Sequence, residues 1–147
     1  MTVLMFTVIF VSHAKNVKAL KIVFTDIYMT TIYRITPSYF DKGALSGICD
    51  TINIVNTKEI KELMLTVNEL QEFISYKTVP DTRGKIIFLY DDNQTEDLCF
   101  SAFFALYMGK LYELSNQFKL LMNRIIISKK PNSEVFQIVH KKKRSAT

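Results

Sequence analysis

Residues 85–114 constrain the fold more than any other part of the chain, because they contain three apolar segments separated by short turns. The segments are residues 85–90 (KIIFLY), 97–106 and 111–114. Residues 91–94 (DDNQ) and 108–110 (MGK) supply turn chemistry between them. Turns of this length join antiparallel strands, whereas parallel neighbours need a crossover of a dozen or more residues. The pattern therefore predicts an antiparallel sheet, with the middle strand bent near Ser101.

Three segments nearer the amino end also have the β-branched, apolar composition of strands. They are residues 20–25, 28–35 (YMTTIYRI) and 48–55. In the last of them Ile52 and Ile54 alternate with polar residues, which is typical of a half-buried strand. Pro37 ends the second segment, and we expect a loop or one helical turn from there to Gly47. Residues 134–140 (EVFQIVH) could form one last edge strand.

Two segments have the apolar periodicity of helices. The first is expected over residues 57–75, with Asn56 as its N-cap and Glu59 completing a capping box. The second follows Ser115, another good N-cap. Apolar residues recur along one face of each helix. They are Ile60, Leu63, Met64, Val67, Leu70 and Ile74 in the first, and Phe118, Leu121, Met122, Ile125 and Ile126 in the second.

The order of these elements predicts the fold class. Hairpin-linked strands and two separated helices indicate an α+β domain. We expect a mainly antiparallel sheet of about five to seven strands, with two amphipathic helices packed on one face. A parallel α/β fold would need a crossover helix between each pair of strands. Residues 15–128 form the expected domain, and they are numerous enough to bury a core without disulfides or metals.

The positive charge of the chain is confined to its carboxyl end. The formal net charge is +5, yet residues 1–128 hold thirteen basic and thirteen acidic residues. Residues 129–147 therefore form a basic extension to a neutral domain, which argues against a nucleic-acid binder whose fold carries a positive face. The run Lys141, Lys142, Lys143 and Arg144 is a candidate contact for an anion, and a solvated tail is the alternative.

The amino end predicts export. Residues 3–11 (VLMFTVIFV) match the apolar core of a secretory signal peptide, and Ser12 and Ala14 are the small residues that cleavage requires. We therefore expect residues 1–14 to be a signal peptide and the protein to be periplasmic or secreted. A membrane-spanning helix needs roughly 20 apolar residues, so we expect no stable membrane span. The alternative is a buried first strand in a cytoplasmic protein.

Cys49 and Cys99 leave two alternatives open. In an exported protein they could form a disulfide that closes a loop of about fifty residues. Otherwise they are two free, buried thiols that act as small apolar side chains.

The scarcity of histidine excludes several chemistries. The chain has two histidines, His13 and His140, and both lie outside residues 15–128. The expected domain therefore has no histidine for a Ser-His-Asp or Cys-His site, for acid–base catalysis or for most zinc sites. The four glycines are isolated, so no phosphate-binding loop is present in the sequence. We expect no cofactor and no enzymatic activity.

Four carboxylates form the only candidate metal site, a calcium site. Asp91, Asp92, Glu96 and Asp97 fall within seven residues and could supply oxygen ligands. They lack the pattern of a calcium-binding EF-hand loop. The alternative is the solvated tip of a hairpin.

Asp81 and Arg83 lie two residues apart, immediately before the KIIFLY segment. We expect a local ion pair that fixes the chain at the start of this strand. Contact with a partner is the alternative for the same two residues.

Five tyrosines fall in expected strands: Tyr28, Tyr33, Tyr90, Tyr107 and Tyr112. An aromatic sheet face can bind a ligand or a protein. The alternative is that these rings are half-buried, with their hydroxyl groups at the surface.

Together these observations predict a small exported α+β domain that acts as a non-enzymatic module, binding a protein, a surface partner or a ligand. The alternative function is a cytoplasmic nucleic-acid or anion-associated protein that uses the basic extension. A carboxylate-based enzyme is a third hypothesis, and it would require two carboxylates that converge in one pocket.

Overall fold

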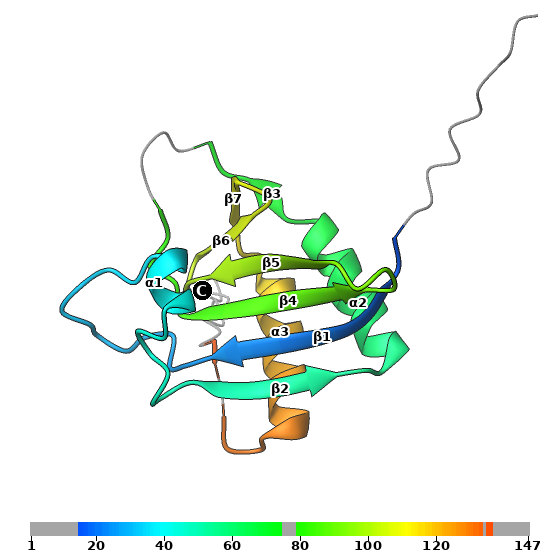
Figure 1. Cartoon of the computed structure of the whole chain (residues 1–147), viewed down its shortest axis with the longest axis horizontal. Coiled ribbons are helices and arrows are strands. Elements are labelled where there is room, and N and C mark those ends of the chain that lie inside the picture. The colour runs from blue at the N-terminus through cyan, green and yellow to red at the C-terminus, as the bar shows by residue number, and fades with distance from the viewer. Residues whose placement is uncertain (1–14, 75–78, 134, 137–147) are drawn as a thin grey trace, which may run out of the picture.

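The computed structural model describes residues 15–74, 79–133 and 135–136. Its centre is a seven-stranded sheet in the order β2-β1-β4-β5-β6-β7-β3 (Figure 1), and every neighbouring pair is antiparallel. The predicted α+β class is confirmed. The strands are β1 (Val17–Phe24), β2 (Asp50–Ile54), β3 (Gln71–Glu72), β4 (Gly84–Tyr90), β5 (Thr95–Phe100), β6 (Phe104–Tyr107) and β7 (Lys110–Glu113).

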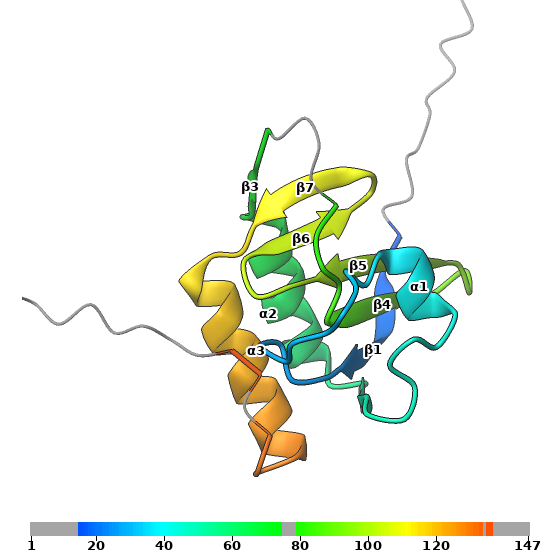
Figure 2. The same ribbon diagram turned by 90° about the vertical axis from the view of Figure 1, so that its left-hand side faces the viewer.

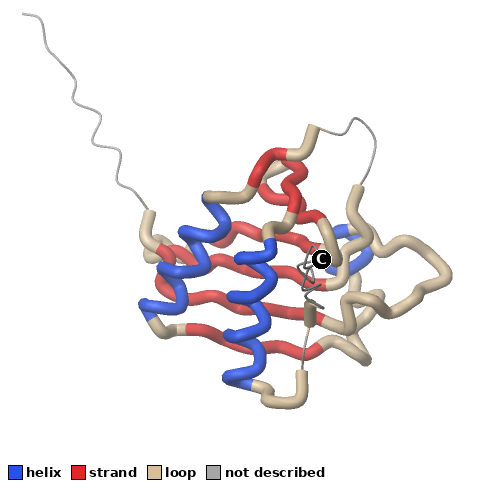
Figure 3. Tube along the Cα trace, turned by 180° about the vertical axis from the view of Figure 1, so that it is seen from behind, coloured by secondary structure: helices blue, strands red, loops and turns tan. Residues whose placement is uncertain are grey.

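Helices α2 (Thr57–Asn68) and α3 (Asn116–Lys129) lie across one face of this sheet (Figure 3), which we call the helix face. The main core fills the space between the helices and the sheet. Alternate strand residues such as Ile22, Ile86 and Phe88 point into it and are fully buried. Period-2 burial in the strands and an apolar stripe on each helix produce this two-layer arrangement.

The short helix α1 (Pro37–Asp41) lies on the opposite side of the sheet from α2 and α3 (Figure 2). Its Phe40 forms a small second core with Ile35 and Leu45, against which Val23 of the sheet packs. We call this side of the sheet the α1 face. The register pairs Val23 with Lys85, so Lys85 also belongs to this face.

Both helix caps follow the sequence, with one difference. Asn56 Oδ1 accepts hydrogen bonds from the backbone N–H groups of Lys58 and Glu59, and Ser115 Oγ accepts one from Phe118. In a full capping box the Glu59 carboxylate would also accept a hydrogen bond from the backbone N–H of Asn56. Glu59 Oε2 accepts no hydrogen bond. That oxygen instead lies 3.7 Å from Lys129 Nζ on the neighbouring helix.

The expected strand over residues 28–35 is wrong. These residues form turns between β1 and α1, and the side chains of Ile32 and Tyr33 are 92% and 78% exposed. Asp26 begins the turn, because its Oδ1 accepts a hydrogen bond from the backbone N–H of Tyr28 and its carbonyl accepts one from Met29. Such side-chain-to-backbone bonds compete with strand pairing.

The first long helix ends earlier than expected. Helix α2 stops at Asn68, whereas the apolar stripe continues through Leu70 to Ile74. Residues 71 and 72 instead pair with β7 and become β3, the edge strand of the sheet. Ile74 is exposed because the chain has left the helical path before reaching it.

The core extends past the expected domain boundary at Ser128. Val135 and Phe136 are buried, and the ring of Phe136 lies beside those of Phe100 and Phe118. Asn123 on α3 holds this segment: its amide donates to the carbonyl of Phe136 at 2.6 Å and its oxygen accepts from both backbone N–H groups.

The expected signal segment 1–14 and the basic run 141–144 lie outside the described residues, as do residues 134 and 137–140 of the expected last strand. Among the described residues, no helix is long and apolar enough to cross a membrane.

Candidate functional site

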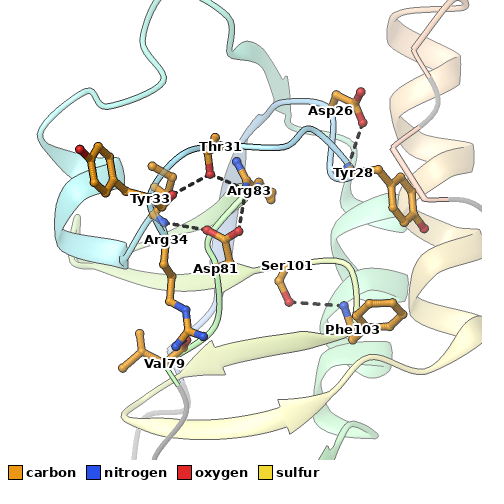
Figure 4. A network of polar contacts seen from close by, with 11 residues as sticks. Asp26, Tyr28, Thr31, Tyr33, Arg34, Val79, Asp81, Arg83, Ser101 and Phe103 are labelled. Carbon is orange, nitrogen blue, oxygen red and sulfur yellow. Dashed lines mark hydrogen bonds and ion pairs between the residues drawn. The ribbon is translucent and has the colours of Figure 1, made fainter.

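Three loops at one end of the sheet line an open cavity of about 270 Å³, which we call the Arg83 cavity (Figure 4). The loops connect β1 to α1, precede β4, and connect β5 to β6. Binding residues concentrate on loops of this kind, which a rigid sheet holds in place. The cavity is lined by Ile27, Met29, Arg34, Val79, Pro80, Asp81, Arg83, Ser101, Ala102, Phe103 and Phe104.

The expected ion pair between Asp81 and Arg83 is confirmed, and both residues lie in the loop that precedes β4. Arg83 Nη2 lies 2.6 Å from Asp81 Oδ2. The other oxygen of Asp81 accepts a hydrogen bond from the backbone N–H of Ile35 at 2.7 Å, and Thr82 N–H donates to the carbonyl of Ile35. Asp81 therefore fixes the position of the β1–α1 loop as well as the start of β4.

Arg83 is 4% exposed, which is uncommon for a charged side chain. Its Nη2 also donates to Thr31 Oγ1 at 2.9 Å, and Thr31 in turn donates to the carbonyl of Tyr33. Its Nη1 is buried and has no hydrogen-bond partner. A buried donor without a hydrogen-bond partner is costly in the low dielectric of a protein interior, so Nη1 is the unsatisfied group of this site.

Arg34 brings a second guanidinium group to the cavity, and unlike Arg83 it is exposed. Among the described residues Arg34 forms one long hydrogen bond, in which Nη1 donates to the carbonyl of Val79 at 3.4 Å. Within the described part of the chain, no carboxylate lies within ion-pairing distance of Arg34. Its donors are therefore available to a ligand.

The opposite wall of the cavity is apolar and is set by a turn. Ser101 Oγ accepts hydrogen bonds from the backbone N–H groups of Phe103 and Phe104 and donates to the carbonyl of Phe104. This turn places the exposed ring of Phe103 at the rim. The ring of Phe104 packs against that of Phe73, with 5.0 Å between ring centroids.

Comparison of the chain with protein-family models, with curated proteins and with solved structures gives no match. The function is therefore inferred from the residues of the site itself.

A larger groove of about 550 Å³ runs between α2 and α3, but its chemistry is less specific. Leu65 and Leu120 are exposed along it. Its arginine, Arg124, is already ion-paired with Glu62 across the groove. Since an exposed pair of this kind satisfies both charges, the groove presents no cation that lacks a partner among the described residues.

The candidate calcium ligands do not converge. Asp91 and Asp92 lie in the exposed turn between β4 and β5, whereas Glu96 and Asp97 lie on β5. Successive strand residues point to opposite faces, so Glu96 faces the helix face and Asp97 the α1 face. No group of three or more potential ligand side chains that could hold a metal ion occurs among the described residues.

Cys49 and Cys99 are free thiols in the structure. Cys99 lies buried on the α1 face, beside Lys85 in the sheet register. Burial raises the pKa of Cys99 from 9.0 to about 11, against the opposing charge of Lys85. A thiol with so high a pKa is a poor nucleophile at neutral pH.

Within the described ranges Lys85 is, with Arg83, one of two buried cations, at 5% exposure. Its Nζ pairs with Asp97 on β5 at 2.8 Å and with Asp41 on α1. Burial lowers the pKa of Lys85, but its hydrogen bonds to Asp41 and Asp97 raise it further, so the pKa lies above its ordinary value. Lys85 therefore fastens α1 to the sheet.

The five tyrosines do not form one aromatic face. Tyr28 and Tyr33 lie in the β1–α1 loop, whereas Tyr90 and Tyr107 face the helices and donate hydrogen bonds to the same oxygen of Glu96, at 2.7 and 2.8 Å. Burial, followed by the bond to Glu96, raises the pKa of both hydroxyl groups. Tyr112 is half-buried on β7 and packs against the main core.

The sequence pointed to Asp81 and Arg83 but not to Arg34, Thr31 or Phe103. Arg34 and Thr31 lie inside the expected strand 28–35, in which only Tyr28 and Tyr33 are candidate binding residues by sequence. The hydrogen bond from the backbone N–H of Ile35 to Asp81 spans 46 positions, so no local sequence pattern predicts it. Asp26 was the available signal, because aspartate at the end of a strand favours a turn.

Proposed function

We propose that this protein is an exported, non-enzymatic binding module that takes its ligand in the Arg83 cavity. The observation that carries the proposal is the composition of the cavity, in which two guanidinium groups lie with an apolar wall. A largely apolar pocket with a few fixed polar groups is the usual form of a ligand site. The Asp81–Arg83 pair and the Ser101 turn hold the walls before any ligand arrives, which lowers the cost of binding.

The polar groups of the cavity favour binding over catalysis. Its ionisable side chains are Asp81, Arg34 and Arg83. Arginine does not release its proton in proteins, and both oxygens of Asp81 already accept hydrogen bonds. A binding role needs only these fixed charges, whereas acid–base catalysis needs a group that exchanges protons.

The test is an amide NMR screen of the full chain against small anionic, neutral and cationic fragments. Binding in the cavity should shift the resonances of residues 27–35, 79–83 and 101–104. Phe103→Ala should weaken this binding by removing part of the wall. The matched control is Leu120→Ala, which removes a similarly exposed side chain from the α2–α3 groove. Fragments that shift only the groove, or no fragment binding at all, would overturn the proposal.

Export is the second part of the proposal, and it is supported by the amino-terminal sequence. Amino-terminal sequencing of the protein recovered outside the cytoplasm should begin at Lys15. A protein that is retained in the cytoplasm and begins at Met1 or Thr2 would contradict export and leave the cavity's role intact.

The basic extension supports a second candidate function, because all of the chain's net positive charge follows Ser128. In this alternative the protein is cytoplasmic and binds nucleic acid or another anion through Lys141–Arg144. Deletion of residues 137–147 tests it while sparing Val135 and Phe136 of the core. Salt-sensitive nucleic-acid binding that this deletion abolishes would favour the alternative.

A further inference from the structure

We infer that the Arg83 cavity binds an organic carboxylate, meaning a molecule with one carboxylate group and a short apolar body. The inference rests on the proposed function and names the class of ligand for the same site. A free organic acid and the carboxyl-terminal residue of a peptide share this chemistry.

The charges of the cavity match one negative charge. Arg34 and Arg83 contribute two positive charges and Asp81 one negative charge, so the lining carries one net positive charge. A monocarboxylate neutralises it. A phosphate dianion would leave the site net negative and would lie close to the carboxylate of Asp81, which it repels.

Arg34 is the residue placed to contact the ligand. It is exposed at the cavity, forms no ion pair among the described residues, and holds only the long bond to Val79. The planar guanidinium fork matches the two oxygens of a carboxylate, and such charge-assisted pairs are the stronger hydrogen bonds of proteins.

Arg83 acts through its field rather than by contact. Its Nη1 is enclosed, so a ligand in the cavity does not reach that atom without rearrangement. Its charge is nevertheless close and is screened less than a charge in water, because the surroundings are largely protein. Asp81 holds the guanidinium in place, so Arg83 and Asp81 are positioning residues for Arg34's ligand.

The apolar wall of the cavity determines the size and polarity of the group that carries the carboxylate. Met29, Val79, Pro80 and the two phenylalanines 103 and 104 line the rest of the cavity. At about 270 Å³ the cavity lies just below the range of roughly 300–1,000 Å³ that holds drug-sized molecules. It therefore suits one small apolar group, of the size of a leucine or phenylalanine side chain.

The experiment compares matched probes by amide NMR titration of the full chain. N-acetylphenylalanine carries the carboxylate, N-acetylphenylalanine amide has the same body without the charge, and inorganic phosphate has charge without the body. We expect the acid to bind about ten-fold more tightly than the amide, which is a usual loss for one charge-assisted contact. Phosphate should bind more weakly than the acid.

Two variants test the assignment of the contact. Arg34→Gln should weaken binding of the acid about ten-fold and leave binding of the amide unchanged. Arg124→Gln is the control, because it removes an exposed arginine of α3 that does not line the cavity. The backbone amide NMR spectra of both variants also test whether the fold is intact.

The outcomes separate this inference from the proposed function. The assignment of a carboxylate ligand would be overturned by any of three results. These are equal binding of the acid and its amide, tighter binding of phosphate than of the acid, and unchanged binding of the acid to Arg34→Gln. The cavity would still be a binding site if other fragments shift its resonances. A short peptide with a free carboxyl terminus, compared with its amidated form, distinguishes the sources: a preference for the peptide acid over the free acid identifies a protein terminus, and the reverse identifies a small acid.

Discussion

The ring of Phe100 lies over Gly84 so closely that a Cβ atom at position 84 would be 2.2 Å from Phe100 Cζ. The two residues are paired across β4 and β5, and Phe100 is fully buried in the main core. Gly84 also stands directly after Arg83. Glycine is thus required here by the approach of a ring, at the point where the sheet meets the Arg83 cavity.

Gly84→Ala should destabilise the protein by about 1–3 kcal/mol or more, because the new methyl group has no room without moving the ring of Phe100. The measurement is the free energy of unfolding in urea. Gly47→Ala is the control, since a Cβ there meets nothing within 4 Å, and it should change stability by no more than about 0.5 kcal/mol. Equal effects of the two substitutions would contradict the close contact.

Asn123→Ala should cost at least about 2 kcal/mol, because it leaves buried backbone groups of Val135 and Phe136 without partners. Asn116→Ala, an exposed asparagine of the same helix, is the control and should be near neutral. A loss of stability from Asn116→Ala as large as that from Asn123→Ala would contradict this role of Asn123.

The double substitution Asp41→Asn and Asp97→Asn should destabilise the protein more than Lys85→Met, by about 1–3 kcal/mol at neutral pH. The double variant leaves a buried ammonium without a carboxylate, whereas the methionine removes the buried charge and leaves two exposed carboxylates in water. Urea unfolding at one pH measures both. Glu72→Gln, which breaks the exposed pair with Lys110, should be nearly silent. A greater loss in Lys85→Met would reverse this explanation.

The free energy of unfolding should fall as the pH rises from about 9 to 11, with a contribution of about 1–2 kcal/mol from Cys99. The folded pKa of Cys99, about 11, lies above its ordinary value of 9.0. The unfolded chain therefore loses the thiol proton first, and the stabilisation present below pH 9 disappears through this window. Cys99→Ser should show a smaller alkaline loss than the unmodified protein at about pH 10.5. An identical loss would mean that Cys99 ionises as readily in the folded state.

Local patterns in the sequence predicted local structure well. The residues at 108 and 109 both have positive φ, as a tight hairpin turn requires, and the hairpin forms where expected. Asn56 and Ser115 cap the helices as expected because a cap depends on bonds within three residues. The expected single strand over residues 97–106 is wrong: these residues belong to two antiparallel strands, β5 and β6, because the hydroxyl of Ser101 forms a tight turn between them.

In three places contacts with distant residues override the local pattern. Tyr28–Ile35 has strand-forming residues, but Asp81, 46 positions from Ile35, accepts a hydrogen bond from the backbone N–H of Ile35. Residues 71 and 72 leave the helical pattern because the edge of β7 offers them backbone partners. Phe136 belongs to the core because Asn123, thirteen positions earlier, binds its backbone.

By itself, the sequence determined the antiparallel hairpins, the two capped helices, the ion pair of Asp81 with Arg83 and the class of fold. Each depends on side-chain periodicity or on bonds between residues a few positions apart. Only the tertiary structure decided the order of the strands, the position of α1 on the face opposite the helices, and the meeting of Arg34 with Arg83 in one cavity. Those features depend on contacts between residues tens of positions apart. Burial and backbone pairing determine these contacts, and no local sequence pattern predicts them.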